Sequence, residues 1–225
     1  MGPLLVIDCY VEGDGAKNYR RLLPERVVES WRPSDGPSTA PATAFDGIMI
    51  TGSAACVTAP EPWMAGVIAL LQDAQKNNVP VLGICFGHQI LAAAAFGMDA
   101  VQKSATPEIG WFDVQIGPDG SALCEGLEAS FTTFMSHFDE VVPCAGMSVF
   151  ASTDRCRVAG YRVDGHRMWG IQFHPEMAQD EAEELTVMRI EGRPDLGFDL
   201  KATLARSCDS THLVNRILAN FLSAP

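Results

Sequence analysis

Short, continuous apolar runs alternate with longer mixed segments in the first half of the chain. The apolar runs are residues 3–8, 45–53 and 79–85. Runs of this length between turn residues are typical of strands that are buried on both faces. The mixed segments predict helices over residues 15–30, 60–78 and 86–97. This alternation predicts an α/β fold with an open, mostly parallel sheet and helices on both faces, and it leaves room for one weak strand before residue 45.

The pattern changes in the second half of the chain. From about residue 108 the segments become shorter and strand-like. The Asp164-Gly165 pair between two alternating runs favours a hairpin turn. After Glu176 the chain returns to helical spacing, which is clearest in residues 211–222. We therefore expect residues 1–225 to form a single domain with a β-rich excursion in its second half.

Composition and charge restrict the classes of partner. The 225 residues are 47% hydrophobic and 20% charged, as in a globular protein, and the formal net charge is −12. An acidic chain is a poor partner for nucleic acid or for an anionic membrane. No apolar stretch approaches the ~20 residues that span a bilayer. The first apolar run is interrupted by Asp8 and follows no basic segment, so it predicts a strand and not a signal peptide.

The cysteines give little sign of a metal or redox site. Seven are present, without regular spacing and without a CxxC pair, so they predict neither a zinc site nor a thioredoxin-type site. Free thiols fit a reducing compartment, and we expect a cytoplasmic protein. We expect no metal and no cofactor.

One cysteine lies at a turn that is typical of a nucleophile. The third apolar run passes through Gly83-Ile84-Cys85-Phe86-Gly87 directly into a helix. A G-x-C-x-G sequence at such a junction is the cysteine counterpart of the nucleophile elbow, in which small residues make room for a sharp turn. The helix N-terminus favours a thiolate, and the N–H of Phe86 points to where an oxyanion would form. Taken alone, the segment fits a buried structural thiol equally well.

A second segment supplies a base and a carboxylate. The strand-like residues 171–173 lead into His174-Pro175-Glu176. Proline favours an extended conformation at the residue before it, and residues i and i+2 of an extended segment project to the same side. Glu176 is therefore placed to hold one imidazole nitrogen of His174 while the other faces a thiol. Together with Cys85, this pattern predicts a Cys-His-Glu triad that attacks an amide carbonyl.

The GICFGHQ and HPE segments together resemble the triad-type members of the class I glutamine amidotransferase family and their γ-glutamyl hydrolase relatives. Features of the family can be matched from the first strand to HPE. The chain looks most similar to stand-alone members such as the glutaminase subunit of GMP synthase and the γ-glutamyl peptide hydrolases. The resemblance implies a flavodoxin-like sheet and attack of Cys85 on the side-chain amide of glutamine. Ammonia would leave, and water or another nucleophile would resolve a γ-glutamyl thioester.

The resemblance also implies a second donor for the oxyanion. Thr51-Gly52-Ser53 ends the second apolar run. In the family the matching glycine loop supplies a backbone N–H, which would come here from Gly52 or Ser53. The chain departs from the family at the next two positions, where Ala54-Ala55 replace a common Gly-Ser or Gly-Pro turn.

Three more positions match residues that hold the substrate in the family. Gln89 matches a side chain that binds the substrate glutamine, although it fits a helix residue facing neighbouring backbone as well. Ser136 and His137 match a segment whose backbone holds the substrate α-amino and α-carboxyl groups. His137 also fits a solvated loop histidine. His88 lies one helical turn after Cys85 and is expected to be a packing residue, not a competing base.

Two enzymatic hypotheses remain open for a small-molecule substrate. The chain is either a glutaminase that passes ammonia to a synthetase partner or a stand-alone γ-glutamyl peptide hydrolase. No P-loop pattern is present, so an acceptor site would have to come from another polypeptide. A third hypothesis is a redox or binding protein on the same fold, such as the DJ-1-like proteins, but these lack His-Pro-Glu. Residues 185–210 look like an insertion that could cap the active site, form a dimer contact or be an exposed loop with partial helix.

Overall fold

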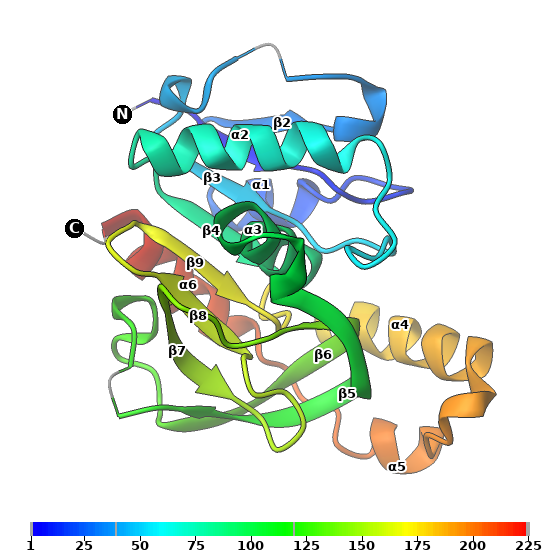
Figure 1. Ribbon diagram of the computed structural model, residues 1–225. Coiled ribbons are helices and arrows are strands. Elements are labelled where there is room, and N and C mark those ends of the chain that lie inside the picture. The colour runs from blue at the N-terminus through cyan, green and yellow to red at the C-terminus, as the bar shows by residue number, and fades with distance from the viewer. Residues whose placement is uncertain (1, 39, 119, 224–225) are drawn as a thin grey trace.

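The computed structural model describes residues 2–38, 40–118 and 120–223, and in this part of the chain the strands form one nine-stranded mixed sheet (Figure 1). The strands are β1 (Leu4–Ile7), β2 (Val28–Trp31), β3 (Gly47–Ile50), β4 (Val81–Ile84), β5 (Val101–Ile116), β6 (Ser130–Val141), β7 (Met147–Ser152), β8 (Gly160–Val163) and β9 (Met168–Ile171). The α-helices are α1 (Lys17–Leu22), α2 (Met64–Lys76), α3 (Phe86–Phe96), α4 (Gln179–Gly192), α5 (Leu200–Leu204) and α6 (Thr211–Ser223).

The sheet combines a parallel half with an antiparallel half. Its strand order is β2-β1-β3-β4-β9-β8-β7-β5-β6, and the strands from β2 to β9 in this order are parallel. The remaining neighbours pair antiparallel. The β8–β9 hairpin turns at Asp164-Gly165, where Gly165 has φ 74°. The predicted flavodoxin-like sheet, its β-rich excursion and this hairpin are confirmed.

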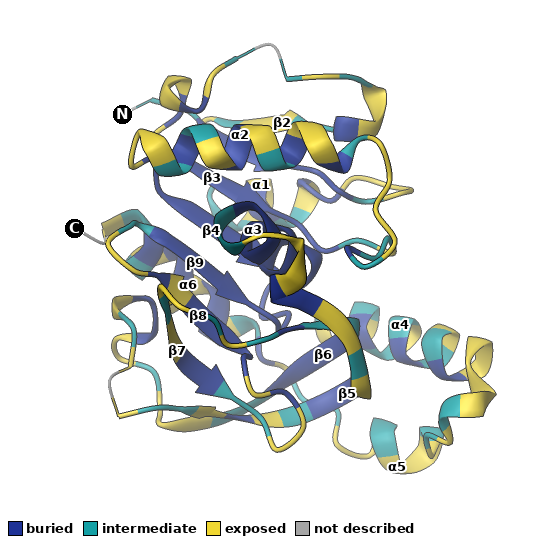
Figure 2. Cartoon of the chain, in the orientation of Figure 1, coloured by how far each residue is buried: buried dark blue, intermediate teal, exposed yellow. Residues whose placement is uncertain are grey.

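Helices cover both faces of the parallel half. Successive side chains of a strand point to opposite faces. Leu5 and Ile7 of β1 therefore join the core under α2 and α3, while Leu4 and Val6 join the core under α1 and α6. Figure 2 shows that α2 keeps an exposed side, whereas α3 is buried along most of its length.

The helix predicted over residues 15–30 is wrong beyond Leu22. In the structure α1 ends at Leu22, and Pro24 follows two residues later. Proline lacks a backbone donor and clashes with the preceding turn, so the helix cannot continue through it. Residues 28–31 instead form β2, the edge strand beside β1. The sequence does not predict β2, because its exposed positions interrupt the apolar pattern. It also lies well before residue 45, where the weak strand is expected.

The antiparallel half curls back toward the parallel half. The register of β5 against β6 shifts between Lys103 and Glu108, and such an irregularity bends a strand. As a result β6 approaches the start of α3, where Sγ of Cys85 lies 3.5 Å from the carbonyl oxygen of Ser136. The curl therefore brings a strand from the second half of the chain beside the predicted nucleophile.

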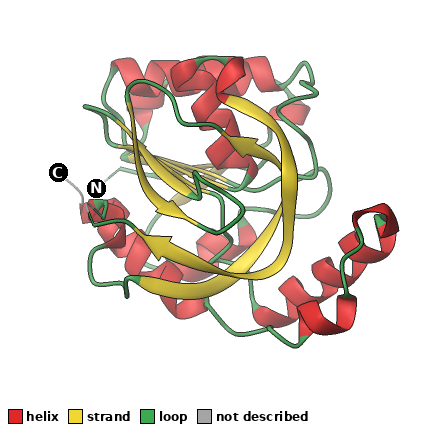
Figure 3. Ribbon diagram, turned by 60° about the horizontal axis from the view of Figure 1, so that its bottom comes forward, coloured by secondary structure: helices red, strands yellow, loops and turns green. Residues whose placement is uncertain are grey.

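The helices α4 and α5 form an arm that stands out from the sheet beside β5 and β6 (Figures 1 and 3). The arm contains most of the segment 185–210, whose first eight residues are the end of α4. Ala182 of α4 packs in a small cluster with Trp111 and Phe134 of the sheet. Neither these helices nor any other helix in the described residues is long and apolar enough to cross a membrane.

Candidate active site

Cys85 occupies a sharp turn between β4 and α3. Its backbone has φ 54° and ψ −106°, a combination that residues with a Cβ rarely adopt. Both flanking glycines are packed against backbone. A Cβ on Gly83 would overlap the carbonyl group of Gly87, and a Cβ on Gly87 would lie 2.5 Å from the carbonyl oxygen of Ile50. A side chain at either position would collide with backbone, so the predicted elbow requires glycine at residues 83 and 87.

The segment after β9 brings His174 and Glu176 beside the thiol. The backbone N–H of His174 donates to the carbonyl oxygen of Phe134 at 2.9 Å, and the two rings pack with centroids 5.8 Å apart. Nδ1 of His174 lies 2.8 Å from Oε1 of Glu176. The imidazole also forms a side-chain hydrogen bond with Cys85. The three residues predicted as a triad thus lie in one hydrogen-bonded chain.

The charges around His174 determine its protonation. Burial alone would lower the pKa of His174, because desolvation disfavours the imidazolium. The negative charges of Cys85 and Glu176 outweigh burial and hold the pKa of His174 well above its usual range. All three residues are at most 4% exposed, so water screens these charges little. The site therefore favours the imidazolium form of His174.

The glycine loop after β3 lies against this pair. A Cβ on Gly52 would be 3.0 Å from Cε1 of His174 and 3.8 Å from Cβ of Cys85. The hydroxyl of Thr51 donates to the carbonyl oxygen of Gly52 at 2.8 Å and so stabilises the loop. Ser53 lines the cavity that opens beside His174. The structure thus brings the predicted oxyanion loop next to Cys85.

Two further predicted residues lie on α3 and are buried. Phe86 is the first residue of the helix, where backbone N–H groups have no helical acceptor, and its ring packs on Trp63. Nε2 of Gln89 donates to the carbonyl oxygen of Asp139 at 2.8 Å and to Oε1 of Gln172 at 3.0 Å. Gln89 is not among the residues that line the cavity. Its side-chain nitrogen is thus engaged within the protein.

Ser136 and His137 project to opposite faces of β6. Ser136 lines the cavity, and its carbonyl oxygen contacts Cys85. The His137 ring is 3.0 Å from the carbonyl oxygen of Asp139 through Nδ1 and 2.8 Å from Oε2 of Glu108 through Nε2. With 2% exposure, His137 is not a solvated loop histidine. Only its backbone remains available to a ligand at this site.

A cavity of about 660 Å³ opens beside His174. One wall is the loop after β1, residues 10–14, and another is α4, which contributes Leu185, Met188 and Arg189. Sequence reasoning does not identify these residues, because the walls come from opposite ends of the chain. The one available signal is the insertion at residues 185–210, and its first residues do border the site.

Asp8 holds the loop that forms the first wall. Its carboxylate accepts the backbone N–H of Tyr10 at 3.1 Å and that of Gly15 at 3.2 Å. The guanidinium of Arg32 donates to the same carboxylate at 2.7 Å. Asp8 is 4% exposed, so this ion pair shapes the loop from within. Asp8 directly follows the buried strand β1, and this position is the feature of the sequence that indicates a role at the site.

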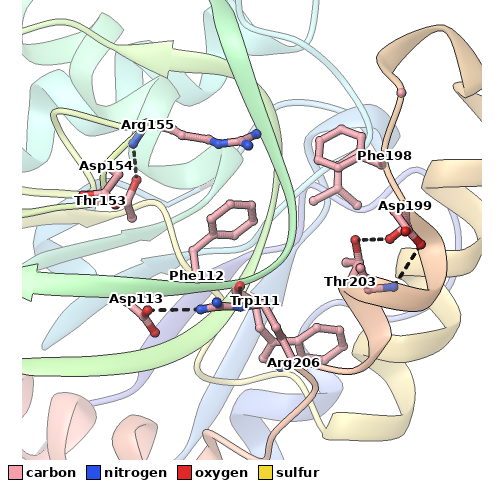
Figure 4. A pocket seen from close by; sticks show the side chains of 13 residues that line it. Trp111, Phe112, Asp113, Thr153, Asp154, Arg155, Phe198, Asp199, Thr203 and Arg206 are labelled. Carbon is pink, nitrogen blue, oxygen red and sulfur yellow. Dashed lines mark hydrogen bonds and ion pairs between the residues drawn. The ribbon is translucent and has the colours of Figure 1, made fainter.

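Figure 4 shows a second cavity, of about 450 Å³, that lies apart from these residues. It lies between β5, the residues after β7 and α5. Phe112 and Arg155 line it, with the guanidinium 5.7 Å above the ring. An ion pair of 3.1 Å between Asp113 and Arg206 joins β5 to the residues after α5. None of the predicted site residues lines this cavity.

His88 is confirmed as a packing residue. It is fully buried, and its ring packs on Tyr161 with centroids 4.8 Å apart. Burial lowers the pKa of His88 to about 3. The ring is therefore neutral at physiological pH and is surrounded by protein.

One group of buried side chains has the composition of a metal site. The ligand atoms of Glu108, His137 and Cys156 lie within 4.8 Å of one another. The imidazole and the carboxylate already bind each other, and Thr153 donates to the second carboxylate oxygen at 2.6 Å. Hydrogen bonds through Glu108 therefore link β5 to His137 of β6 and to Thr153 after β7.

Comparison with curated proteins and family models relates the chain to enzymes of known class. The model of the family described as glutamine amidotransferase class-I matches residues 5–189. The glutamine-hydrolysing GMP synthase of Stenotrophomonas maltophilia is 32% identical over 177 residues, which cover 73% of this chain and 32% of that protein. One subunit of the glutamine-hydrolysing GMP synthase of Sulfolobus acidocaldarius is 39% identical over 105 residues, 46% of this chain and 54% of that subunit. The chain thus spans about a third of the first relative and about half of the second.

Solved structures show the same fold. A glutamine amidotransferase from Thermotoga maritima has a TM-score of 0.81 and 17% identity over 100% of both chains. Another from Methylobacillus flagellatus has a TM-score of 0.80 and 22% identity, covering 99% of this chain and 94% of its own. The family match includes Cys85, His174 and Glu176. This chain therefore belongs to the class I glutamine amidotransferase family.

Proposed function

We propose that this protein hydrolyses the side-chain amide of glutamine, or the γ-amide of a γ-glutamyl compound, through a thioester on Cys85. The observation that carries the proposal is the hydrogen-bonded chain from Cys85 through His174 to Glu176 at the wall of an open cavity. Membership of the family supports a reaction directed at glutamine. It also favours hydrolysis over a redox or binding function on the same fold.

The reaction has two halves that share one proton carrier. In the first, the Cys85 thiolate attacks the amide carbonyl carbon and forms a C–S bond. The C–N bond then breaks while Nε2 of His174 gives its proton to the leaving nitrogen. In the second, neutral His174 accepts a proton from water, whose oxygen attacks the thioester, and glutamate leaves as the thiolate re-forms. Glu176 fixes the orientation of the ring through its hydrogen bond to Nδ1.

The negative oxygen of each tetrahedral intermediate requires donors near Cys85. The N–H of Phe86, in the first turn of α3, is one candidate. The glycine loop supplies the other from Gly52 or Ser53, and the short distance from Gly52 to Cys85 and His174 supports this assignment. The backbone of Ser136 and His137 would hold the α-amino and α-carboxyl groups of the substrate.

Glutamate formation tests the proposal directly. The purified protein is incubated with glutamine and with γ-glutamyl dipeptides, and glutamate is quantified. We expect turnover with at least one of them, and an acid quench should trap a glutamyl adduct on the peptide that contains Cys85. Cys85→Ala should abolish both signals, whereas Cys144→Ala, which alters a half-buried thiol away from the site, should keep them. Activity that persists in Cys85→Ala would refute the proposal.

A second candidate is a glutaminase that passes ammonia to a synthetase. The similarity to GMP synthases whose names state glutamine hydrolysis favours it, together with the share of their length that this chain spans. In this case the acceptor site lies on another polypeptide. The rate of glutamate formation is then expected to rise when a GMP synthase lacking its own glutaminase domain is added. An unchanged rate with that enzyme would argue against GMP synthesis as the destination.

A further inference from the structure

The cavity beside His174 is larger than the release of ammonia requires. Its volume of about 660 Å³ lies in the range of pockets that enclose drug-sized ligands. The glutamyl part of a substrate must reach Cys85, which contacts Ser136 and His174, two residues that line this space. The remaining space, bounded by α4 and the loop after β1, is open to the group on the far side of the scissile amide.

The wall formed by α4 and the residues before it is apolar. Met177, Leu185 and Met188 all line the cavity. Met188 is 59% exposed, and Val11 from the facing loop is 65% exposed. These are two of the five large apolar side chains that are exposed in the described residues. Because exposed apolar side chains that gather at a concave site mark binding surfaces, this wall is suited to an apolar group.

The same wall carries a cation, Arg189, whose guanidinium lies 5.7 Å over the ring of Phe138. Phe138 is two residues after Ser136, so both project to the same face of β6. Nε of Arg189 is buried and has no hydrogen-bond partner among the described residues. A planar guanidinium held in this way is well suited to bind a carboxylate through two parallel hydrogen bonds.

The other charges at the cavity limit the ligand to few negative groups. Glu12, Asp14 and Glu181 line it together with Lys17 and Arg189. Asp14 is paired with Arg20 at 2.8 Å outside the cavity, but Glu12 and Glu181 have no ion-pair partner among the described residues. A ligand with several carboxylates would meet this negative field. A single carboxylate at Arg189 avoids it.

We infer that the substrate is a γ-glutamyl amino acid, whose apolar side chain packs against Met177, Leu185 and Met188 and whose free carboxylate binds Arg189. This inference rests on the proposed function, because the γ-amide must be the bond that Cys85 attacks. The C–N bond breaks as the C–S bond forms, the proton of His174 goes to the α-nitrogen of the leaving amino acid, and water then releases glutamate. In this inference the helix α4 of the arm selects the leaving group.

Four substrates separate the parts of the inference. Values of kcat/KM are compared for γ-glutamyl-leucine, γ-glutamyl-leucine amide, γ-glutamyl-glycine and glutamine. We expect γ-glutamyl-leucine to exceed γ-glutamyl-glycine by about tenfold or more, because of apolar contact. We expect it to exceed its amide by about tenfold to a hundredfold, because only the acid has a carboxylate for Arg189. Equal values for all four would overturn the inference while leaving the proposed function intact, whereas no hydrolysis of any would refute the proposed function itself.

A matched pair of arginine variants tests Arg189. Arg193 also lies over the Phe138 ring, at 5.3 Å, but it is paired with Asp195 at 2.8 Å and does not line the cavity. Arg189→Gln should lower the preference for γ-glutamyl-leucine over its amide by about tenfold, and Arg193→Gln should leave that ratio unchanged. If Arg189→Gln lowers kcat/KM equally for both substrates, Arg189 does not bind the leaving-group carboxylate and the inference fails.

A change on the apolar wall supplies an independent test. Met188→Ser removes an exposed apolar side chain from the cavity without disturbing a core contact. It should lower the ratio of γ-glutamyl-leucine to γ-glutamyl-glycine by about threefold to tenfold. Met98→Ser, which alters an exposed methionine outside this cavity, is the control. An unchanged ratio in Met188→Ser would place the leucine side chain elsewhere and contradict the assignment.

Discussion

Nδ1 of His174 lies 2.8 Å from Oε1 of Glu176, and both side chains are almost completely buried. A carboxylate can only accept here, so the proton of this hydrogen bond sits on Nδ1 and leaves Nε2 to face Cys85. The charge of Glu176 also helps to raise the pKa of His174 against the opposing effect of burial. One carboxylate thus sets both the orientation and the protonation of the proposed base.

Glu176→Gln is expected to impair turnover and to move its pH dependence. The substitution keeps the size of the side chain but removes a charge that favours the imidazolium, so the pKa of His174 falls. Because His174 must be protonated to release the leaving nitrogen, the alkaline limb of the kcat/KM profile should move to lower pH. We expect kcat to fall by about 10²-fold. Glutamate formation measured across pH tests this, and an unshifted alkaline limb would show that Glu176 does not control His174.

Gly52→Ala is expected to reduce activity more than stability. The added Cβ would lie 3.0 Å from Cε1 of His174, so the ring must move, and small displacements of a reacting group cost about 10²-fold in rate. Gly66→Ala is the matched control, because its Cβ meets nothing closer than the Trp31 ring at 3.9 Å. That change should stabilise α2 by up to about 1 kcal/mol without altering kcat. Equal kcat values for Gly52→Ala and the wild type would show that the ring is not confined by the glycine loop.

The strain at the elbow predicts an unusual order of stability for two inactive variants. At φ 54° and ψ −106°, Cys85 has the mirror image of an extended conformation, which glycine adopts freely and other residues do not. Cys85→Gly should therefore be more stable than Cys85→Ala by about 1 kcal/mol. In most other positions alanine is the more stabilising of the two residues. Chemical denaturation of both variants gives the difference, and a more stable alanine variant would mean that the turn is not strained.

Local sequence was sufficient to predict the central features of the site. The elbow around Cys85 depends on glycines within two residues on either side, and His174 and Glu176 are separated by one proline. Each of these arrangements is determined within a few residues. The strand β2 was missed for the opposite reason, since its exposed positions conceal an edge strand that is defined only by pairing with β1.

The substrate side of the site could not be predicted in the same way. The cavity wall combines the loop held by Asp8 with Arg189 of α4, and nothing in the sequence relates two segments so far apart. The Gln89 side chain matched a substrate-binding position of the family, yet hydrogen bonds to Asp139 and Gln172 occupy its nitrogen. The His137 side chain also fitted a solvated loop residue, yet it is buried against Glu108. Which face of a strand or helix a residue presents is decided by the curl of the sheet, and that is a property of the whole fold.

His88 provides a prediction about stability instead of catalysis. Burial, assisted by the charge of His137, lowers its pKa from 6.5 to about 3. Below pH 6.5 the unfolded chain therefore binds a proton at this residue while the folded protein does not, so stability is lost as the pH falls toward 3. Each pH unit in this window should cost about 1.4 kcal/mol at most from this residue. The loss ends below the folded-state pKa, where both states are protonated.

Urea unfolding of wild type and His88→Asn at neutral and mildly acidic pH measures this contribution. The variant should be less stable at neutral pH, because it loses the packing of the ring on Tyr161. Its stability should nevertheless decrease less between the two pH values, since it has no proton to gain on unfolding at residue 88. His212→Asn, which replaces an exposed histidine, should keep the wild-type slope. If His88→Asn also keeps that slope, His88 must bind a proton in the folded protein, and its buried ring would not be neutral.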